Sequence, residues 1–253
     1  MEPHRRPEQL RIVILGALSA MATEIARIYA ARGADFGLLG SSSERLADLA
    51  ADLKVRGAGK IKTLAADLSA SQSCDATIDE FADEMGGVDL LILAYGILGD
   101  QARAQREPQH TLDILTTNFT SAALWLLAAA KRMDEKGTIA VFSSVAGDRG
   151  RQSNYVYGSA KAGLGVFAQG MAHEFAPTGL RIIVIKPGLI VTPMTEGMKR
   201  SGLLWVDARR AARIVVDAID RKRGPFVYVP GFWRWIMLVI RAVPAPLFHR
   251  TRL

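Results

Sequence analysis

Residues 11–40 read RIVILGALSAMATEIARIYAARGADFGLLG. The stretch contains two short apolar runs, RIVILG at 11–16 and DFGLLG at 35–40, separated by a helical pattern that ends on glycine. Short, continuously apolar runs are typical of strands in a parallel sheet whose two faces are both covered by helices. The stretch therefore predicts a strand, a helix and a second, parallel strand, joined by a right-handed crossover.

The same alternation continues along most of the chain. Five further apolar runs are expected to form strands, at 60–66, 88–94, 137–143, 181–188 and 225–230. Helical patterns lie between them, several closing on glycine. This rhythm predicts an α/β fold, a Rossmann-type doubly wound parallel sheet of about seven strands. The sequence shows no internal repeat or linker, so we expect residues 1–253 to form one domain.

Composition excludes several classes of protein. The chain has 253 residues, of which 49% are hydrophobic and 23% charged, as in a globular protein. A lone cysteine, Cys74, excludes an internal disulfide and fits a reducing compartment. The first ten residues, MEPHRRPEQL, lead into the first strand with no long apolar run between them, so no signal peptide is expected. These observations favour a cytoplasmic location.

The net charge of +7 is unevenly distributed. No zinc-ligand spacing, base-reading basic helix or aromatic-laced basic strand accompanies it, so we expect neither nucleic-acid binding nor a metal site. Between residues 221 and 253 the lysines and arginines meet no acidic residue. Positive charge beside apolar residues favours an anionic membrane surface or a phosphate as its partner.

The first strand-to-helix turn, GALSAMA at 16–22, is a candidate dinucleotide site. A tight glycine turn before a helix offers backbone N–H groups and a positive dipole end to a pyrophosphate. Gly16 closes the strand, but the two later positions that usually carry glycine are occupied by other residues, among them Ala20. By itself the turn is compatible with a nucleotide site or with a plain tight turn.

The adenosine end leaves the cofactor open. An acidic residue after the second strand would bind a ribose 2′-hydroxyl, and a basic one would favour a 2′-phosphate. The sequence has neither there; Ser41 follows Gly40, and Arg45 is the nearest cation. Asp67, after the third strand, can accept a hydrogen bond from adenine or can act as a helix N-cap.

Two residues of SNYVYGSAKAGL, 153–164, form a candidate acid–base pair. Tyr157 and Lys161 are four residues apart, so in a helix they lie on the same face. A free phenol has a pKa of about 10, and an adjacent ammonium favours the phenolate. Tyr157 is therefore a candidate general acid whose pKa we expect Lys161 to lower.

The chain resembles the short-chain dehydrogenase/reductases over essentially its whole length. The resemblance rests on Gly16 with its small-residue turn, Asn118 in TTNFTSA, Ser144 in VFSSVAG, Tyr157 and Lys161 in YGSAK, and PGLIVTPM from Pro187 to Met194. The spacing of thirteen residues from Ser144 to Tyr157 and of four more to Lys161 is far more specific than any single element. One departure stands out, since the usual Asn-Asn-Ala-Gly appears here as Leu93-Ala94-Tyr95-Gly96.

The resemblance implies a role for each matching residue. Tyr157 is the proton donor, and once the nicotinamide is oxidised its positive charge is expected to lower the Tyr157 pKa together with Lys161. Ser144 donates to the carbonyl oxygen where charge develops, Lys161 also holds the nicotinamide ribose, and Asn118 anchors a relay water. The cofactor is NAD(H) or NADP(H), and the resemblance favours NADH. The residues expected to contact it, besides Tyr157 and Lys161, are Gly16, Ser19, Ala20, Met21, Ser41, Asp67, Leu68, Ala94, Gly96, Pro187, Gly188, Ile190 and Thr192.

The C-terminal stretch VPGFWRWIMLVIRAVPAPLFHRTRL is unusual. Its apolar part, from Phe232 to Val243, is too short to cross a bilayer, which needs about 20 residues. Arginines among aromatic and aliphatic residues suit an amphipathic helix lying in the membrane interface. Residues 230–253 are thus predicted to be a basic apolar tail that contacts the membrane peripherally; the alternative is an arm packed on another subunit.

A closer resemblance concerns AYGILGD at 94–100, the segment 143–164 and the tail from Pro230. These are similar to the decaprenylphosphoryl-2-keto-β-D-erythro-pentose reductases. The resemblance implies reduction of the 2-keto group of a polyprenylphosphoryl pentose to the arabinose epimer, the second half of an oxidation–reduction epimerisation in cell-wall precursor synthesis. It also implies a flavin-dependent oxidase partner. Arg149 and Arg151 are candidates for the substrate phosphate, or solvated loop charges, and Tyr155 is expected to line the substrate side or to pack.

Two other hypotheses remain. The protein could reduce another lipid or steroid ketone, which a substrate pocket without basic residues would favour. It could also be a catalytically inactive cofactor-binding scaffold at the membrane, although the intact Ser144, Tyr157 and Lys161 count against this. We further expect a homo-oligomer.

Overall fold

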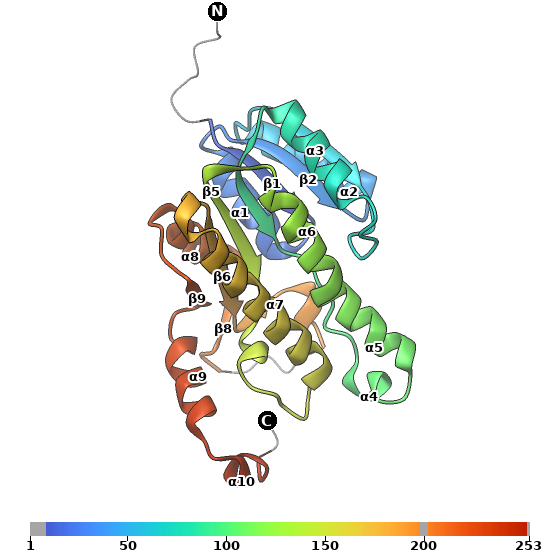
Figure 1. Ribbon diagram of the computed structural model, residues 1–253, viewed down its shortest axis with the longest axis vertical. Helices are drawn as coiled ribbons and strands as arrows, with labels where there is room; N and C mark the ends of the chain where they lie inside the picture. The colour runs from blue at the N-terminus through green and yellow to red at the C-terminus, as the bar shows by residue number, and fades with distance from the viewer. Residues whose placement is uncertain (1–8, 198–201, 252–253) are drawn as a thin grey trace, which may run out of the picture.

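The computed structural model describes residues 9–197 and 202–251, and its centre is a parallel sheet of seven strands. The sheet order is β3-β2-β1-β4-β5-β6-β9, with each of the seven predicted strands in place (Figure 1). The strands are β1 (Arg11–Leu15), β2 (Asp35–Gly40), β3 (Ile61–Ala65), β4 (Val88–Leu93), β5 (Met133–Phe142), β6 (Arg181–Pro187) and β9 (Phe226–Val229). The strand order reverses between β1 and β4, where a doubly wound sheet opens its ligand crevice.

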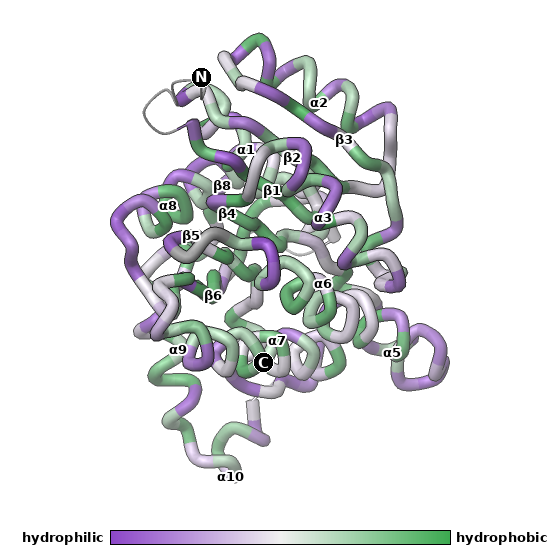
Figure 2. Tube along the Cα trace, turned by 45° about the horizontal axis from the view of Figure 1, so that its top comes forward, coloured by the Kyte–Doolittle hydropathy of each residue, from purple (hydrophilic) through white to green (hydrophobic). Residues whose placement is uncertain are grey.

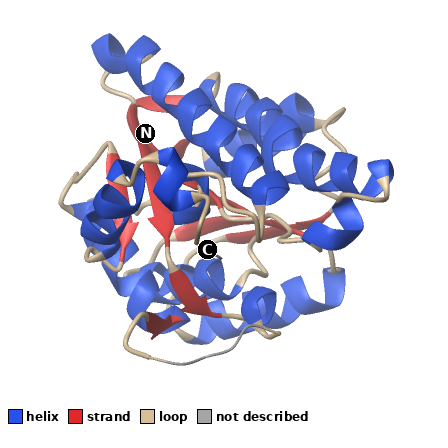
Figure 3. Cartoon of the chain, turned by 90° about the horizontal axis from the view of Figure 1, so that it is seen from below, coloured by secondary structure: helices blue, strands red, loops and turns tan. Residues whose placement is uncertain are grey.

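Helices cover both faces of the sheet, as the apolar strands predict (Figure 3). Ile12 and Ile14 of β1 point into the core beneath α1 and α8, whereas Val13 and Leu15 point into the core beneath α3, α6 and α7. The main helices are α1 (Ala20–Ala30), α2 (Ser43–Val55), α3 (Cys74–Met85), α5 (Pro108–Leu115), α6 (Ser121–Ala130), α7 (Tyr155–Glu174) and α8 (Ala208–Asp220). Figure 2 shows hydrophobic residues concentrated along the central strands.

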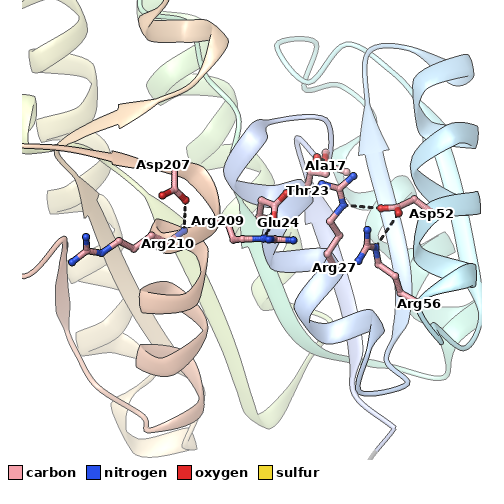
Figure 4. Close-up of polar contacts among 9 residues, drawn as sticks. All are labelled: Ala17, Thr23, Glu24, Arg27, Asp52, Arg56, Asp207, Arg209 and Arg210. Carbon is pink, nitrogen blue, oxygen red and sulfur yellow. Dashed lines mark hydrogen bonds and ion pairs between the residues drawn. The ribbon is translucent and has the colours of Figure 1, made fainter. Parts of the chain in front are cut away.

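Ion pairs fasten α1 to its neighbours (Figure 4). Arg27 of α1 donates to Asp52 of α2 at 2.7 Å, and Arg56 binds the same carboxylate at 2.9 Å. At the other end of α1, the hydroxyl of Thr23 donates to the carbonyl of Ala17 at 3.1 Å. The Thr23 contact holds the start of α1 against the turn after β1, and the ion pairs of Asp52 hold α1 against α2.

A short second sheet was not predicted from the sequence. It pairs β7 (Leu189–Val191) with β8 (Trp205–Asp207) in parallel, directly after β6. Strands of three residues carry too few side chains for a period to be read. The pairing holds the segment after β6 in place beside the carboxyl end of the main sheet.

The helical stretch Pro108–Ala130 is long and apolar enough to cross a membrane by length and composition. Half of its most apolar window is buried inside the protein, however. Trp125 and Leu126 pack on the sheet, 1% and 0% exposed. The stretch is thereby accounted for as a core helix.

The tail forms two helices, α9 (Trp233–Ala242) and the short α10 (Ala245–Phe248). The helical interpretation of the apolar run from Phe232 to Val243 is confirmed. Figure 1 shows both helices beyond the carboxyl end of the sheet, below β9. Residues 252–253 of the predicted tail lie outside the described residues.

Candidate active site

The four predicted catalytic residues come from three elements at the carboxyl end of the sheet. Ser144 follows β5, Asn118 lies between α5 and α6, and Tyr157 and Lys161 lie on the first turns of α7. Tyr157 is 9% exposed and Lys161 3%, and the Lys161 Nζ lies 5.9 Å from the Tyr157 ring centroid. The expected shared helical face is therefore present, and it points inward.

Two glycines let the Ser144 loop approach α7. After Ser144 the chain makes one 3₁₀ turn, Val145–Asp148. A Cβ at Gly147 would lie 2.7 Å from the backbone nitrogen of Ala162, and one at Gly158 would lie 2.9 Å from the carbonyl oxygen of Ala146. Both distances are shorter than contacts that real side chains make. The glycine of the YGSAK motif thus has a packing function, which is to bring Ser144 beside Tyr157.

Asn118 lies in a π-helical turn, Thr116–Thr120, inside an otherwise α-helical stretch. Such turns free backbone groups from the helical ladder and occur frequently at functional sites. The Asn118 amide donates to the carbonyls of Ile114 and Ile97, at 2.9 and 2.8 Å, and its oxygen accepts from the Ile97 N–H. The side chain is fully buried. Asn118 therefore joins the helix to the loop after β4 and fixes both near Lys161.

Lys161 is enclosed by backbone groups. Its Nζ donates to the carbonyl of Phe142 at 3.0 Å, and its own carbonyl accepts from the Ser143 hydroxyl at 2.8 Å. A Cβ at Gly96 would overlap the side-chain oxygen of Asn118 and lie 3.2 Å from Lys161 Nζ. The single glycine kept from the family's usual Asn-Asn-Ala-Gly run is therefore required by this close approach.

The protonation states correct one expectation. Burial raises the pKa of Tyr157 to about 12, and a hydrogen bond with Ser144 opposes this rise. Burial also lowers the pKa of Lys161 to about 8. In the protein alone the predicted lowering of the phenol pKa by the ammonium is therefore not found, because burial of the phenol dominates. The lowering expected beside an oxidised nicotinamide stays a prediction. Tyr157 is protonated at neutral pH, which is the state a proton donor needs.

The turn after β1 fits a dinucleotide pyrophosphate. Gly16 has a φ of +88°, and a Cβ there would lie 2.7 Å from that of Tyr95, so glycine is required. Ser19 caps α1 by accepting from the N–H of Ala22. The N–H groups of Ala20 and Met21 belong to the first turn, which has no intrahelical partners. The residues that replace the later glycines of the usual pattern therefore leave the backbone N–H groups at the start of α1 available to a phosphate.

The adenosine end is open to solvent. Ser41 and Arg45 are exposed, and Ser42 caps α2. Asp67 accepts from the N–H and hydroxyl of Ser69 in a local turn, so the alternative reading of Asp67 as a helix N-cap is wrong. Leu68 is buried, and its carbonyl accepts from the indole of Trp125.

The residues expected to contact the nicotinamide lie on β6, on β7 and in the turn that follows β7. Pro187 and Gly188 close β6, whose neighbour across the sheet is β9. Ile190 is 3% exposed within β7, and Thr192 begins a 3₁₀ turn with a capping box formed with Thr195. Ala94 lies directly after β4 of the main sheet.

The three predicted substrate residues line one cavity of about 680 Å³ beside the start of α7. Arg149 donates from Nη1 to the carbonyls of Ile240, Arg241 and Val243, and its guanidinium lies 3.9 Å from the Phe248 ring centroid. The reading of Arg149 as a solvated loop charge is therefore wrong, because it binds the end of α9. Arg151 is half-buried, and Tyr155 is exposed and accepts from Gln105.

Sequence reasoning missed a buried ionic group behind Ser144. Asp148, whose side chain is 2% exposed, pairs with Lys186 of β6 and accepts from the Tyr228 hydroxyl of β9 at 2.7 Å. It also missed Trp233 of α9, which packs against Gly188 and, with Met237, covers Val145. Only the position of Asp148 close after Ser144 could have been read as a signal. The partners come from strands more than 30 residues away.

Comparison with known proteins identifies the family. The short chain dehydrogenase family model matches residues 11–201. The chain belongs to the short-chain dehydrogenase/reductase family. It is 38% identical to an uncharacterised oxidoreductase of Mycobacterium tuberculosis over 94% of this chain and 96% of that protein, and 37% identical to one of Streptomyces coelicolor over 94% of each. A bovine 3-oxoacyl-[acyl-carrier-protein] reductase is 29% identical over 73% of this chain and 77% of that protein.

Solved structures of this short-chain dehydrogenase/reductase fold carry nicotinamide cofactors. A 3-oxoacyl-[acyl-carrier protein] reductase from Brucella melitensis in complex with NAD matches with a TM-score of 0.76 at 24% identity, over 90% of this chain and 98% of that one. A dehydrogenase from Burkholderia cenocepacia with bound NADP matches with a TM-score of 0.78 at 16% identity, over 87% and 91%. The protein is an NAD(P)-dependent oxidoreductase with a Rossmann-type fold.

Proposed function

We propose that this short-chain reductase uses NADH to reduce a ketone on a membrane-resident, lipid-linked substrate, the 2-keto group of a polyprenylphosphoryl pentose, to give the arabinose epimer. A flavin-dependent oxidase that makes the ketone would be its partner. The observation that carries the proposal is the position of α9. One face of this helix packs on the loop that follows Ser144, here called the catalytic loop, and its other face is apolar and exposed.

The chain's own residues supply the proton chemistry. Tyr157, protonated at neutral pH, donates its phenolic proton to the carbonyl oxygen, a role typically worth about 10²–10⁴-fold in rate. Ser144 accepts from the Ala146 N–H at 3.1 Å, and its hydroxyl, which hydrogen-bonds Tyr157 in the protein alone, is placed to donate to the same oxygen. The cofactor, when bound, supplies a hydride to the carbonyl carbon. Lys161 and Asn118 hold the end of β5 and the loop after β4 around this point.

The outer face of α9 supports a lipid-borne substrate. Trp235, Leu238 and Val239 are 64%, 57% and 65% exposed. Arg234 and Arg241, also exposed, flank them with positive charge. Its inner face, through Trp233 and Met237, packs against Val145, the residue after Ser144. A helix that reaches from the membrane interface to the catalytic loop suits a ketone presented from a bilayer.

A second candidate within the same reaction class is reduction of another lipid ketone. The sequence similarity to a 3-oxoacyl-[acyl-carrier-protein] reductase favours it. The cavity beside α7 is lined by Arg149, Arg151 and His249. These basic residues favour an anionic substrate over a neutral steroid-type ketone.

The deciding assay uses membranes that contain a polyprenylphosphoryl ribose and its flavin oxidase. Purified protein is added with NADH or NADPH, and cofactor oxidation is followed together with the sugar on the lipid. Arabinose on the lipid would support the proposal, and the faster nucleotide would name the cofactor. If neither nucleotide is consumed while a simple lipid ketone is reduced in parallel, the sugar assignment is wrong and the second candidate stands.

A further inference from the structure

The described residues contain four buried side-chain atoms without a hydrogen-bond partner, and their positions are informative. The atoms are Gln101 Nε2, Arg151 Nε, Asn154 Oδ1 and Trp233 Nε1. Gln101 accepts from the N–H of Val156 at the start of α7, and Asn154 is the N-cap of α7. Two of the four atoms therefore lie at the start of α7, one lies in the loop before α7 and one lies on α9; these segments surround Ser144 and Tyr157. Buried polar atoms are normally paired, so an unpaired one on a residue that lines a cavity, as Arg151 does, points to a polar partner bound there.

Arg151 is the most informative of the four because it carries a charge. Burial lowers the pKa of its guanidinium, while the negative charge of Asp148 opposes this. Asp148 is itself engaged by Lys186 and Tyr228. Within the described ranges, the hydrogen bond of the Arg151 guanidinium is to the Met237 sulfur, at 3.4 Å, and thioether sulfur is a weak acceptor. Burying a guanidinium costs free energy when no anion accepts its hydrogen bonds, and a bound anionic ligand would offset this cost.

The two arginines of this loop have different functions. Arg149 binds three carbonyl groups at the end of α9 and stacks on Phe248, which brings the C-terminal segment against the loop. Phe248, His249 and Thr251 then form one wall of the cavity of about 680 Å³. Arg151 and Tyr155 lie on the other wall, and Tyr155 is two residues before Tyr157 in the sequence. Arg149 thus builds the cavity, and Arg151 is left to bind something in it.

We propose that this cavity is the headgroup end of the substrate site, where the Arg151 guanidinium binds an oxyanion, a phosphate or a carboxylate, on a lipid substrate. The inference rests on the proposed reductase function, since it assigns the cavity to the substrate whose ketone reaches Tyr157. Arginine binds both oxyanions through paired N–H groups. The C-terminal segment is then part of the substrate site, because without its wall the cavity is an open surface.

The test measures binding at equilibrium, without cofactor and without a ketone. Farnesyl phosphate, farnesoic acid and farnesol, each below its micelle concentration, are titrated into the full-length protein by calorimetry. We expect at least one of the two anions to bind about tenfold tighter than farnesol, and the tighter anion names the headgroup. Arg151→Gln should abolish this preference, and Arg151→Lys should keep part of it.

Arg250→Gln is the matched control, because it removes the same charge from the same end of the molecule at an exposed position outside the cavity lining. It should leave the preference for the anion within about twofold of the wild type. Equal binding of all three ligands would overturn the inference, as would an equal loss in Arg151→Gln and Arg250→Gln. Because the assay involves no turnover, a failed reductase assay leaves this result standing, and failed anion binding leaves the role of Tyr157 standing.

Discussion

Tyr157 and Lys161 lie on one inward face of α7, and burial moves their pKa values in opposite directions. The phenol is kept protonated, and the ammonium is made easier to deprotonate. Each shift disfavours the charged form, as expected for groups removed from water. At the level of single residues the site is therefore held in a state ready to donate a proton.

Replacing Tyr157 with Phe tests the proton donor directly. Tyr157→Phe removes one hydroxyl from a buried site and should leave the fold and cofactor affinity unchanged. Turnover should fall by about 10²–10⁴-fold. Cofactor affinity is measured by nucleotide fluorescence and turnover by nucleotide oxidation with a lipid ketone. Substantial residual reduction would exclude Tyr157 as the donor.

Replacing Lys161 with Met should abolish turnover and raise stability at neutral pH. A shift of the Lys161 pKa from 10.5 to about 8 corresponds to a burial cost of up to about 3 kcal/mol at pH 7. Between pH 8 and 10.5 the unfolded state binds more protons than the native state, so the stability of the wild type rises with pH and the cost disappears.

The measurement is the free energy of unfolding of Lys161→Met and of the wild type in urea from pH 7 to pH 10.5. The stability advantage of the variant should be largest at pH 7 and should shrink through the upper half of this range. An advantage that is constant with pH would show that the ammonium is not desolvated in the native protein.

The sequence predicts much of the site at this scale, and the reason is local spacing. Tyr157 and Lys161 share a helix turn, so one period places both. The direction of the Tyr157 pKa shift in the protein alone could not be predicted, because it depends on how completely the surrounding loops exclude water. The Asp148–Lys186–Tyr228 group could not be predicted at all, since its members come from three separate elements.

At the scale of elements, α9 is docked beside the nicotinamide end through a glycine. The indole of Trp233 occupies the space that a side chain at Gly188 would need. Gly188→Ala should therefore displace Trp233 and loosen α9 from the catalytic loop. Limited proteolysis should cut the variant faster after residue 230, and the near-ultraviolet circular dichroism of the tryptophans should weaken.

Gly231→Ala is the control for this prediction. It adds the same methyl group two residues before Trp233, where a Cβ would meet no atom within 4 Å. Its proteolysis should match that of the wild type. Equal cleavage of Gly188→Ala and Gly231→Ala would show that Trp233 does not hold the tail in place.

The seven strands of the main sheet could be predicted because each is a largely apolar run between helical patterns; β3, which contains Lys62 and Thr63, is the least apolar of them. The pairing of β7 with β8 could not, because Leu189–Val191 and Trp205–Asp207 are too short to show a period and join through tertiary contact alone. The π-helical turn at Asn118 is invisible in the sequence for a similar reason. It exists because the Asn118 amide takes up the carbonyl of Ile114 that the helix gives up.

At the scale of the whole molecule, two exposed apolar surfaces lie on different elements. The tail surface comprises Trp235, Leu238 and Val239 of α9. The helix surface comprises Leu124 and Leu127 of α6 together with Val166 of α7, which are 43%, 44% and 67% exposed. We propose that the tail surface makes the predicted membrane contact and that the helix surface makes the predicted self-association, so mutation should separate the two.

The tail surface is predicted to bind anionic lipid. Trp235→Glu combined with Val239→Glu places two negative charges among Arg234 and Arg241, and both positions are exposed enough for the fold to tolerate them. Flotation with vesicles of phosphatidylglycerol and phosphatidylcholine should recover the wild type and lose most of this variant. Binding of the wild type should weaken as salt rises, because basic residues supply part of the attraction.

Leu124→Glu combined with Leu127→Glu is the matched control, since it places two negative charges on the helix surface. It should float with vesicles as the wild type does while its mass by light scattering falls from oligomer to monomer. The reverse pattern, in which the α9 variant becomes monomeric and still floats, would assign the tail to a neighbouring subunit. Membrane delivery of the substrate through α9 would then be excluded, because a helix covered by a second copy cannot also lie in the lipid interface.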